Sequence, residues 1–169
     1  MEDIFSLYGE VAMDIAEKIR AIITPEEKEL IETPPTTSIV ALNFYEQGRQ
    51  LYEAAQIVKN FQMEQQAEIY FIKAAELDST YTDPILKLGW IQHHLGNEDS
   101  ALLLANKALR INTSSSNAYF LKGIVLYYHF GIEKEAEIAF NNALKYNPNY
   151  PSPMRELGNI YFNRGNFAR

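Results

Sequence analysis

The sequence predicts an all-α fold in which antiparallel helix hairpins stack in a row, preceded by an extra amphipathic helix. The main observation is that small residues repeat. Two alanine series and one glycine series recur at intervals of 34 and then 35 residues: Ala67, Ala101 and Ala136; Ala74, Ala108 and Ala143; and Gly89, Gly123 and Gly158. A period in this range is typical of helix–turn–helix units that bury together a face that one unit cannot bury alone.

The N-terminal region predicts one helix over roughly residues 3–23. Its apolar side chains recur every three or four residues and form one stripe: Ile4, Leu7, Val11, Ile15, Ile19 and Ile22. Thr24 and Glu27 then form a capping box with Pro25 at the first helical position, which predicts a short helix to about Glu32. Because soluble proteins rarely expose an apolar strip, we expect the first helix to pack on the first repeat or on a second copy.

Two prolines within residues 33–38 mark the clearest break in the chain, because proline removes a hydrogen-bond donor and restrains its predecessor. We therefore divide the chain into residues 1–38, with the N-terminal helices and a Pro/Thr linker, and residues 39–169, with the array. Helices of the array are expected at roughly 40–58, 62–77, 83–95, 98–111, 117–129, 133–146 and 151–164. This gives about three to four hairpins, and we expect the last to be truncated at Arg169 with an apolar face exposed.

Turn and crossing positions support the same register. Gly96, Gly131 and Gly165 fit the turn that ends the first helix of each unit, where glycine adopts positive φ at little cost. The interval from Gly123 to Gly131 is eight residues and that from Gly89 to Gly96 is seven, which explains the 35-residue period. The alanines fit positions where two helices cross closely.

These residues resemble the tetratricopeptide repeat family over roughly residues 40–169. The matching motifs are Leu88-Gly89…Gly96…Ala101…Ala108, Ala136…Phe140…Ala143…Pro148 and Leu157-Gly158…Tyr161…Gly165, with an earlier half-match in Ala67…Phe71…Ala74. Thr113 and Ser79 depart from the pattern, since they stand where the family usually has proline. The resemblance implies a right-handed superhelix that binds a protein or peptide on its concave face.

A second resemblance concerns the chain before the repeats. Residues 35–51 are similar to the segment that leads into the repeats of bacterial multidomain regulators and cyclase-type signalling proteins. In such proteins an acidic helix precedes this segment, and residues 3–12 match it. The resemblance implies a piece of a longer chain whose upstream effector domain is absent.

Composition and motifs argue against several classes of function. The chain has no cysteine and a net charge of −7, which excludes a disulfide framework and disfavours nucleic-acid binding. No apolar run approaches the ~20 residues that span a bilayer, and no signal peptide is present, so we expect a cytoplasmic protein without membrane contact. His93 and His94 are adjacent, so they do not form the i,i+4 pair of a metal site. No phosphate loop or nucleophile motif occurs, so we expect no enzyme, cofactor or metal.

The candidate partner-binding surface lies on the first helix of each unit, which lines the concave face of such arrays. Counting from each glycine step gives the candidates, which are rich in the aromatic anchors that interfaces favour: Leu86, Trp90, His93, His94, Phe120, Ile124, Tyr127, Tyr128, Arg155, Asn159, Phe162 and Asn163. Trp90 and Tyr127 could equally pack between units. Relatives that grip the carboxylate tail of chaperones use Lys, Asn and Arg on this face. Leu86, Trp90, Ser152 and Glu156 stand at those places here, so that clamp is absent.

Two classes of function remain open at this point. The first is a protein-interaction scaffold in a larger bacterial signalling or transcription regulator, which binds a peptide or helix in an aromatic-lined groove. The second is a structural module that mediates self-association, as a homodimer through the N-terminal helix or the C-terminal end, or that docks its own effector domain. A carrier subunit of an enzyme complex is a third and less favoured interpretation.

Overall fold

The computed structural model describes residues 4–18 and 34–165. These residues form helices only: α1 (Ile4–Lys18), α3 (Ile39–Val58), α4 (Phe61–Leu77), α5 (Thr82–His94), α6 (Glu98–Ile111), α7 (Ser116–Tyr128), α8 (Glu133–Tyr146) and α9 (Pro151–Asn163). Every helix from α3 to α9 begins and ends within one residue of the predicted bounds. The short helix predicted from Thr24 to Glu32, and the first helix beyond Lys18, lie outside the described residues.

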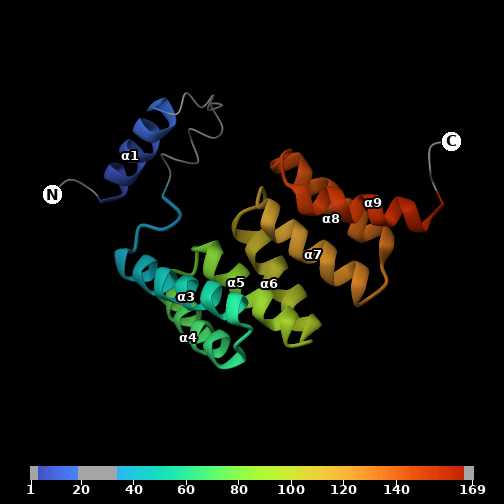
Figure 1. Ribbon diagram of the computed structural model, residues 1–169, viewed down its shortest axis with the longest axis horizontal. Helices are drawn as coiled ribbons and strands as arrows, with labels where there is room; N and C mark the ends of the chain where they lie inside the picture. Colours follow the sequence, from blue (N-terminus) through green and yellow to red (C-terminus); the bar gives the residue numbers. More distant parts are fainter. Residues whose placement is uncertain (1–3, 19–33, 166–169) are drawn as a thin grey trace.

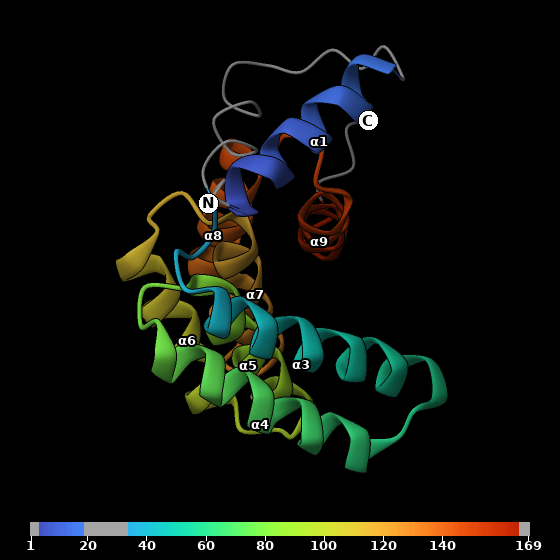
Figure 2. The same cartoon turned by 90° about the vertical axis from the view of Figure 1, so that its left-hand side faces the viewer.

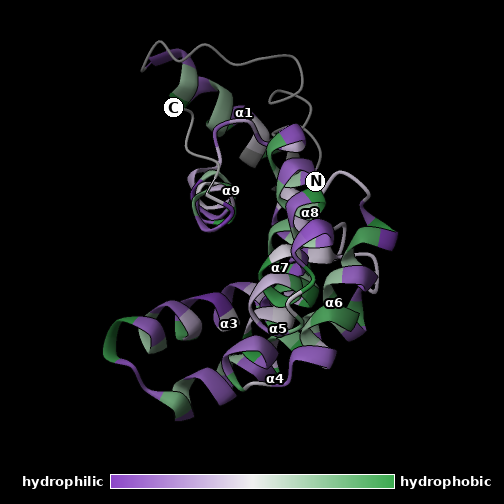
Figure 3. Cartoon of the chain, turned by 90° about the vertical axis from the view of Figure 1, so that its right-hand side faces the viewer, coloured by the Kyte–Doolittle hydropathy of each residue, from purple (hydrophilic) through white to green (hydrophobic). Residues whose placement is uncertain are grey.

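Helices α3 to α9 follow one another along a curved array (Figure 1). Consecutive helices pack in the pairs α3–α4, α5–α6 and α7–α8, and α9 packs against α8. Helices α3, α5, α7 and α9 lie on the inner side of the curve, while α4, α6 and α8 lie on the outer side (Figures 2 and 3). The predicted stack of antiparallel helix hairpins is therefore confirmed.

Capping side chains and turns explain where the helices begin and end. The side chains of Ser38, Asn60 and Ser115 accept hydrogen bonds from backbone N–H groups in the first turns of α3, α4 and α7. The glycines predicted to end α5, α7 and α9 have φ of 67–75°. Lys59 ends α3 with φ of 52°, so a non-glycine residue makes the equivalent turn of the first hairpin.

Glycines in the first helices allow the two helices of a hairpin to approach closely. A methyl group on Gly123 would lie 2.4 Å from the ring of Phe140, and one on Gly48 would lie 2.8 Å from the ring of Phe71. Gly48 therefore extends the glycine series to α3, which with α4 forms a complete hairpin. The six alanines of the two series are all fully buried, as their predicted place at helix crossings requires: Ala67, Ala74, Ala101, Ala108, Ala136 and Ala143.

In the middle hairpin, α5–α6, a different side chain packs on the glycine of the first helix. Ala105 stands where the other two hairpins have Phe71 and Phe140, so no ring from α6 covers Gly89. Instead Leu121 of α7 reaches across, and its Cδ2 would lie 2.6 Å from a methyl group on Gly89. Leu121 is fully buried among the alanines of α6. The core is therefore continuous between neighbouring hairpins.

Helix α1 stands apart from this core. It makes no extensive contact with any other described helix, and its Leu7, Val11 and Ile15 are 52%, 48% and 53% exposed. The expectation that α1 packs on the first repeat is wrong for the single chain, while packing on a second copy stays a prediction. Ile19 and Ile22, which complete the predicted stripe, lie outside the described residues.

Candidate partner-binding surface

All twelve predicted residues lie on the inner helices α5, α7 and α9, but three of them are not available to a partner. Leu86, Phe120 and Ile124 are only 5%, 8% and 8% exposed. Neighbouring inner helices crowd together on the inside of the curve, so these side chains pack between helices as part of the core. This corrects the sequence-based expectation for these three positions.

Trp90 is half-buried and joins two hairpins. Its ring lies 5.7 Å from that of Phe120 on α7 and 5.8 Å from the imidazole of His93. It packs against the core cluster of α5–α6 and also against the cluster of α7–α8. The packing role that the sequence left open for Trp90 is therefore present, and only part of its surface remains for a partner.

The two adjacent histidines link α5 to the outer helices α6 and α4 through hydrogen bonds. Nδ1 of His93 donates to the carboxylate of Glu98 on α6 at 2.8 Å, and Nδ1 of His94 donates to Glu64 on α4 at 2.8 Å. The imidazole of His94 also stacks on Tyr52 of α3, with ring centroids 6.3 Å apart. Each histidine has one carboxylate partner, and no group of three or more metal-ligating side chains occurs in the parts of the chain that the structure describes.

Around α7 and α9 the predicted residues form a polar network on a buried carboxylate. Glu156 is 3% exposed and accepts hydrogen bonds from the Tyr128 hydroxyl at 2.6 Å, from Arg155 at 2.9 Å and from Asn159 at 3.1 Å. Burial alone would raise the pKa of Glu156, but these hydrogen bonds outweigh it and hold the pKa below the usual value. The side-chain amide of Asn163 on α9 donates a hydrogen bond to the Tyr127 hydroxyl on α7, which makes a second link between these two helices.

Among the predicted aromatic residues, the exposed ones lie on the inner side of α7 and α9. Tyr128 is 59% exposed and Phe162 is 61% exposed, and Tyr127 is half-buried beside Tyr128 with ring centroids 4.9 Å apart. Together with the accessible part of Trp90 on α5, these residues form what we call the aromatic strip. The aromatic strip is narrower than the surface that the sequence predicts, because Leu86, Phe120 and Ile124 are buried in the core.

Sequence reasoning missed the inner residues of α3. At the offsets from Gly48 that define the other candidates stand Tyr45, Arg49, Tyr52 and Glu53. Arg49 donates to Glu46 and to Glu53, so its charge is neutralised within α3. Burial raises the pKa of Tyr52 to about 12. The glycine step at Gly48 was the available signal, but it precedes Gly89 by 41 residues and so falls outside the 34-residue period.

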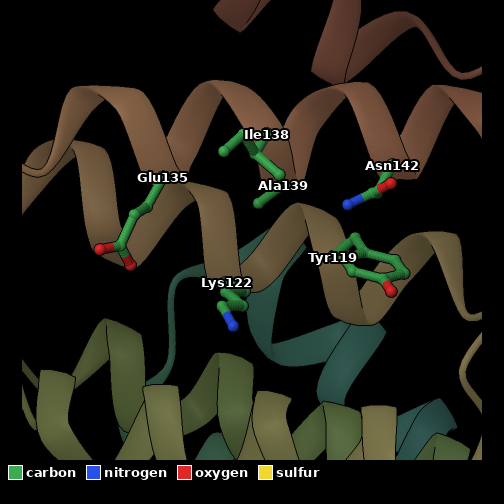
Figure 4. A pocket seen from close by; sticks show the side chains of 6 residues that line it. All are labelled: Tyr119, Lys122, Glu135, Ile138, Ala139 and Asn142. Atoms are coloured by element: carbon green, nitrogen blue, oxygen red, sulfur yellow. The ribbon is translucent and has the colours of Figure 1, made fainter.

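One pocket of about 140 Å³ lies between α7 and α8 (Figure 4). Its lining residues are Tyr119, Lys122, Glu135, Ile138, Ala139 and Asn142. Small-molecule sites commonly measure about 300–1,000 Å³, so this hollow is too small for one. None of the predicted partner-binding residues lines it.

Comparison with known proteins identifies the fold. No family model and no curated protein matches the chain. Among solved structures, the first TPR domain of human RPAP3 is 20% identical, with a TM-score of 0.63 over 75% of this chain and 94% of that chain. This chain has a tetratricopeptide-like fold. The first TPR of Spaghetti (RPAP3), bound to the HSP90 peptide SRMEEVD, gives a TM-score of 0.61, at 20% identity over 75% of this chain and 94% of that chain.

Two further solved structures have a similar fold. The Arabidopsis OM64 TPR domain is 18% identical over 73% of this chain and 98% of that chain, with a TM-score of 0.61. The Yersinia enterocolitica type III secretion translocator chaperone SycD is 18% identical over 73% of this chain and 87% of that chain, with a TM-score of 0.58. At such identities the likeness shows the fold alone. Within residues 4–18 and 34–165, no helix has the length and hydropathy needed to cross a membrane.

Proposed function

We propose that this chain is a non-enzymatic interaction scaffold that receives an apolar or aromatic segment of a protein partner on the aromatic strip. The observation that carries the proposal is the exposure of Tyr128 and Phe162 beside half-buried Trp90 and Tyr127, on three successive inner helices. Aromatic side chains of this kind are favoured anchors at interfaces. The RPAP3 domain, which shares the fold, is bound to a peptide in its solved structure.

The inner face favours an apolar segment over an acidic tail. A tail that ends in a carboxylate needs unpaired cationic side chains, but Arg49 and Arg155 already pair with carboxylates of their own helices. Leu86 and Glu156, at two places where the chaperone-tail relatives have cations, are buried. We therefore propose that the partner differs in chemistry from the HSP90 peptide that the RPAP3 domain binds.

The wider setting follows from the second resemblance. We propose that the scaffold forms part of a larger bacterial signalling or transcription regulator in the cytoplasm, because residues 3–12 and 35–51 resemble the segments that precede the repeats in such proteins. Finding an upstream effector domain in the complete gene would support this setting. Finding no further domain there would contradict the setting and would leave the proposed scaffold role unaffected.

The scaffold role can be tested with two peptide probes. A random peptide library is selected on the full chain, and the selected peptides are compared with SRMEEVD by fluorescence anisotropy. We expect selected peptides rich in aromatic or aliphatic residues, and no binding of SRMEEVD. Removing the anchors with Tyr128→Ala and Phe162→Ala should weaken binding at least tenfold, since hot-spot residues commonly contribute about 2 kcal/mol or more.

The control is Leu103→Ala, which removes an exposed apolar side chain from α6 on the outer side of the curve. It should leave peptide binding unchanged. Equal binding to the parent and to the two inner variants would refute the aromatic strip as the site. Tight binding of SRMEEVD would refute the proposed chemistry of the partner.

A second candidate function is self-association, which the exposed apolar stripe of α1 favours. This role and peptide binding use different surfaces, so one chain can perform both.

A further inference from the structure

The last described helix, α9, has one face whose counterpart on α7 is covered by the second helix of its hairpin. Met154, Gly158 and Tyr161 of α9 each follow by 35 residues their counterparts Tyr119, Gly123 and Leu126 of α7. On α7, helix α8 covers this face: Tyr119 stacks on Tyr146 at 5.8 Å, and Phe140 packs on Gly123. The face on α9 therefore has the register of a surface that accepts another helix.

On α9 this face is open except at the Tyr161 hydroxyl, which donates to Glu137 of α8. A methyl group built on Gly158 would meet no atom of the described residues within 4 Å. Met154 and Tyr161 are 48% and 38% exposed, whereas Leu126, the counterpart of Tyr161, is 3% exposed. We call Met154, Gly158 and Tyr161 the α9 face. An unoccupied glycine at the centre of an apolar helix face lets a second helix approach closely, as Gly48 and Gly123 do within their hairpins.

The same chain carries a helix, α1, that makes no extensive contact with any other helix among the described residues. Leu7, Val11 and Ile15 of α1 form an exposed aliphatic stripe, and Figure 3 shows hydrophobic residues along this helix. From Leu7 to Ile15 is eight residues, about 12 Å along a helix, and Met154 to Tyr161 spans about 10 Å. An aliphatic side chain can fill the space over such a glycine, since Leu121 fills that over Gly89. The two surfaces therefore match in length and in chemistry.

We propose that the α9 face of one copy receives α1 of a second copy. Within one chain α1 lies on the same side of the molecule as α3, apart from the array, and α9 lies at the opposite end (Figure 1), so the contact joins the two ends of different chains. Reciprocal exchange of α1 closes a twofold dimer with two such contacts. Two contacts bring the buried area closer to the roughly 1,200 Å² of a stable interface than one helix pair does.

The charged side chains at the edges of the two surfaces are mostly paired within their own helices. Asp14 flanks the stripe of α1 and pairs with Lys18, and Arg155 flanks the α9 face and pairs with Glu156. The proposed contact therefore depends on apolar packing. The proposal deepens the self-association role proposed above, and it uses residues outside the aromatic strip.

The test is the molar mass of the full chain, measured by size-exclusion chromatography with light scattering over a concentration series. The parent chain should change from monomer to dimer as concentration rises. Gly158→Leu fills the α9 face and should abolish the dimer, while its circular dichroism stays that of the parent because the added side chain enters open space. Val11→Asp places a charge in the α1 stripe and should abolish it too. The matched control Leu103→Asp, on exposed outer surface, should dimerise like the parent.

Mixing the two monomeric variants gives the decisive result. Gly158→Leu retains an intact α1 and Val11→Asp retains an intact α9 face, so together they should form a mixed dimer with one of the two contacts, at a higher concentration than the parent dimer needs. Pairing of α1 with α1, or of α9 with α9, would give no mixed dimer and would overturn the proposal. A parent chain that is monomeric at every concentration, or a Gly158→Leu variant that still dimerises, would also overturn it. Peptide binding by the monomeric Gly158→Leu variant shows separately whether the proposed scaffold role holds.

Discussion

The glycine series allows one substitution to be compared at repeat-equivalent positions. Replacing a helical glycine with alanine stabilises a helix by about 0.5–1 kcal/mol when the methyl group has room. At Gly158 it has room, since no atom in the part of the chain that the structure describes lies within 4 Å. At Gly123 the methyl group would lie 2.4 Å from the Phe140 ring, which is fully buried and cannot move without disturbing the core. Overpacking of this kind costs about 1–3 kcal/mol.

Gly158→Ala should therefore raise the free energy of unfolding by up to about 1 kcal/mol, and Gly123→Ala should lower it by about 1–2 kcal/mol. The change in the free energy of unfolding for Gly89→Ala should lie between these two values, because the closest contact of the added methyl group is with the terminal methyl group of Leu121. The assay is urea unfolding followed by circular dichroism, at a concentration where the chain is monomeric. Amide exchange in α9 serves as a local measure, because the end of an array can open separately. Changes of the same sign at Gly158 and Gly123 would refute the packing argument.

Three further predictions concern packing and charge. Ala101→Leu and Ala136→Leu should each lower the melting temperature, since both alanines are fully buried at helix crossings and overpacking costs about 1–3 kcal/mol; variants that melt with the parent would disprove the register. Trp90→Ala should lower the free energy of unfolding by about 2–3 kcal/mol in urea titrations, because its ring joins two core clusters; a change below about 1 kcal/mol would contradict this. The lowered pKa of Glu156 stabilises the fold above the usual glutamate pKa of 4.5, and this stabilisation is lost as pH falls through the lower pKa of the folded state. Melting temperatures from neutral pH to about pH 3 should thus fall less for Glu156→Gln than for the parent, and parallel curves would exclude the effect.

The sequence predicts the helices well because the repeat imposes several constraints at once. The period, the alanines at the crossings and the glycines with positive φ all place the same boundaries. The first hairpin is the exception, since α3 has 20 residues and the first helices α5, α7 and α9 have 13 each. This extra length moves Gly48 out of the period, so the inner residues of α3 were not among the candidates.

The surface was harder to predict, because sequence offsets say which face a residue occupies but not how closely neighbouring helices approach. Phe120 and Tyr128 lie on the same inner helix, yet Phe120 is buried against Phe140 and Tyr150 while Tyr128 is exposed. The buried carboxylate of Glu156 was equally hidden, since acidic residues usually lie on solvated faces. Its burial depends on donors from two helices, a tertiary arrangement that no local pattern of residues reveals.

The same network couples the aromatic strip to the end of the array. Helix α9 is held to the outer helix α8 by Tyr161 and Arg164, which both contact Glu137. It is held to the inner helix α7 through Tyr128 and Glu156. A partner seated on Tyr128 and Phe162 would touch both α7 and α9, so it would bind only while α9 is docked. By mass action such a partner stabilises the docked state, by about 2.7 kcal/mol at a concentration one hundred times Kd. Binding on the inner face should then order α9 and, with it, the α9 face to which we propose that a second chain docks.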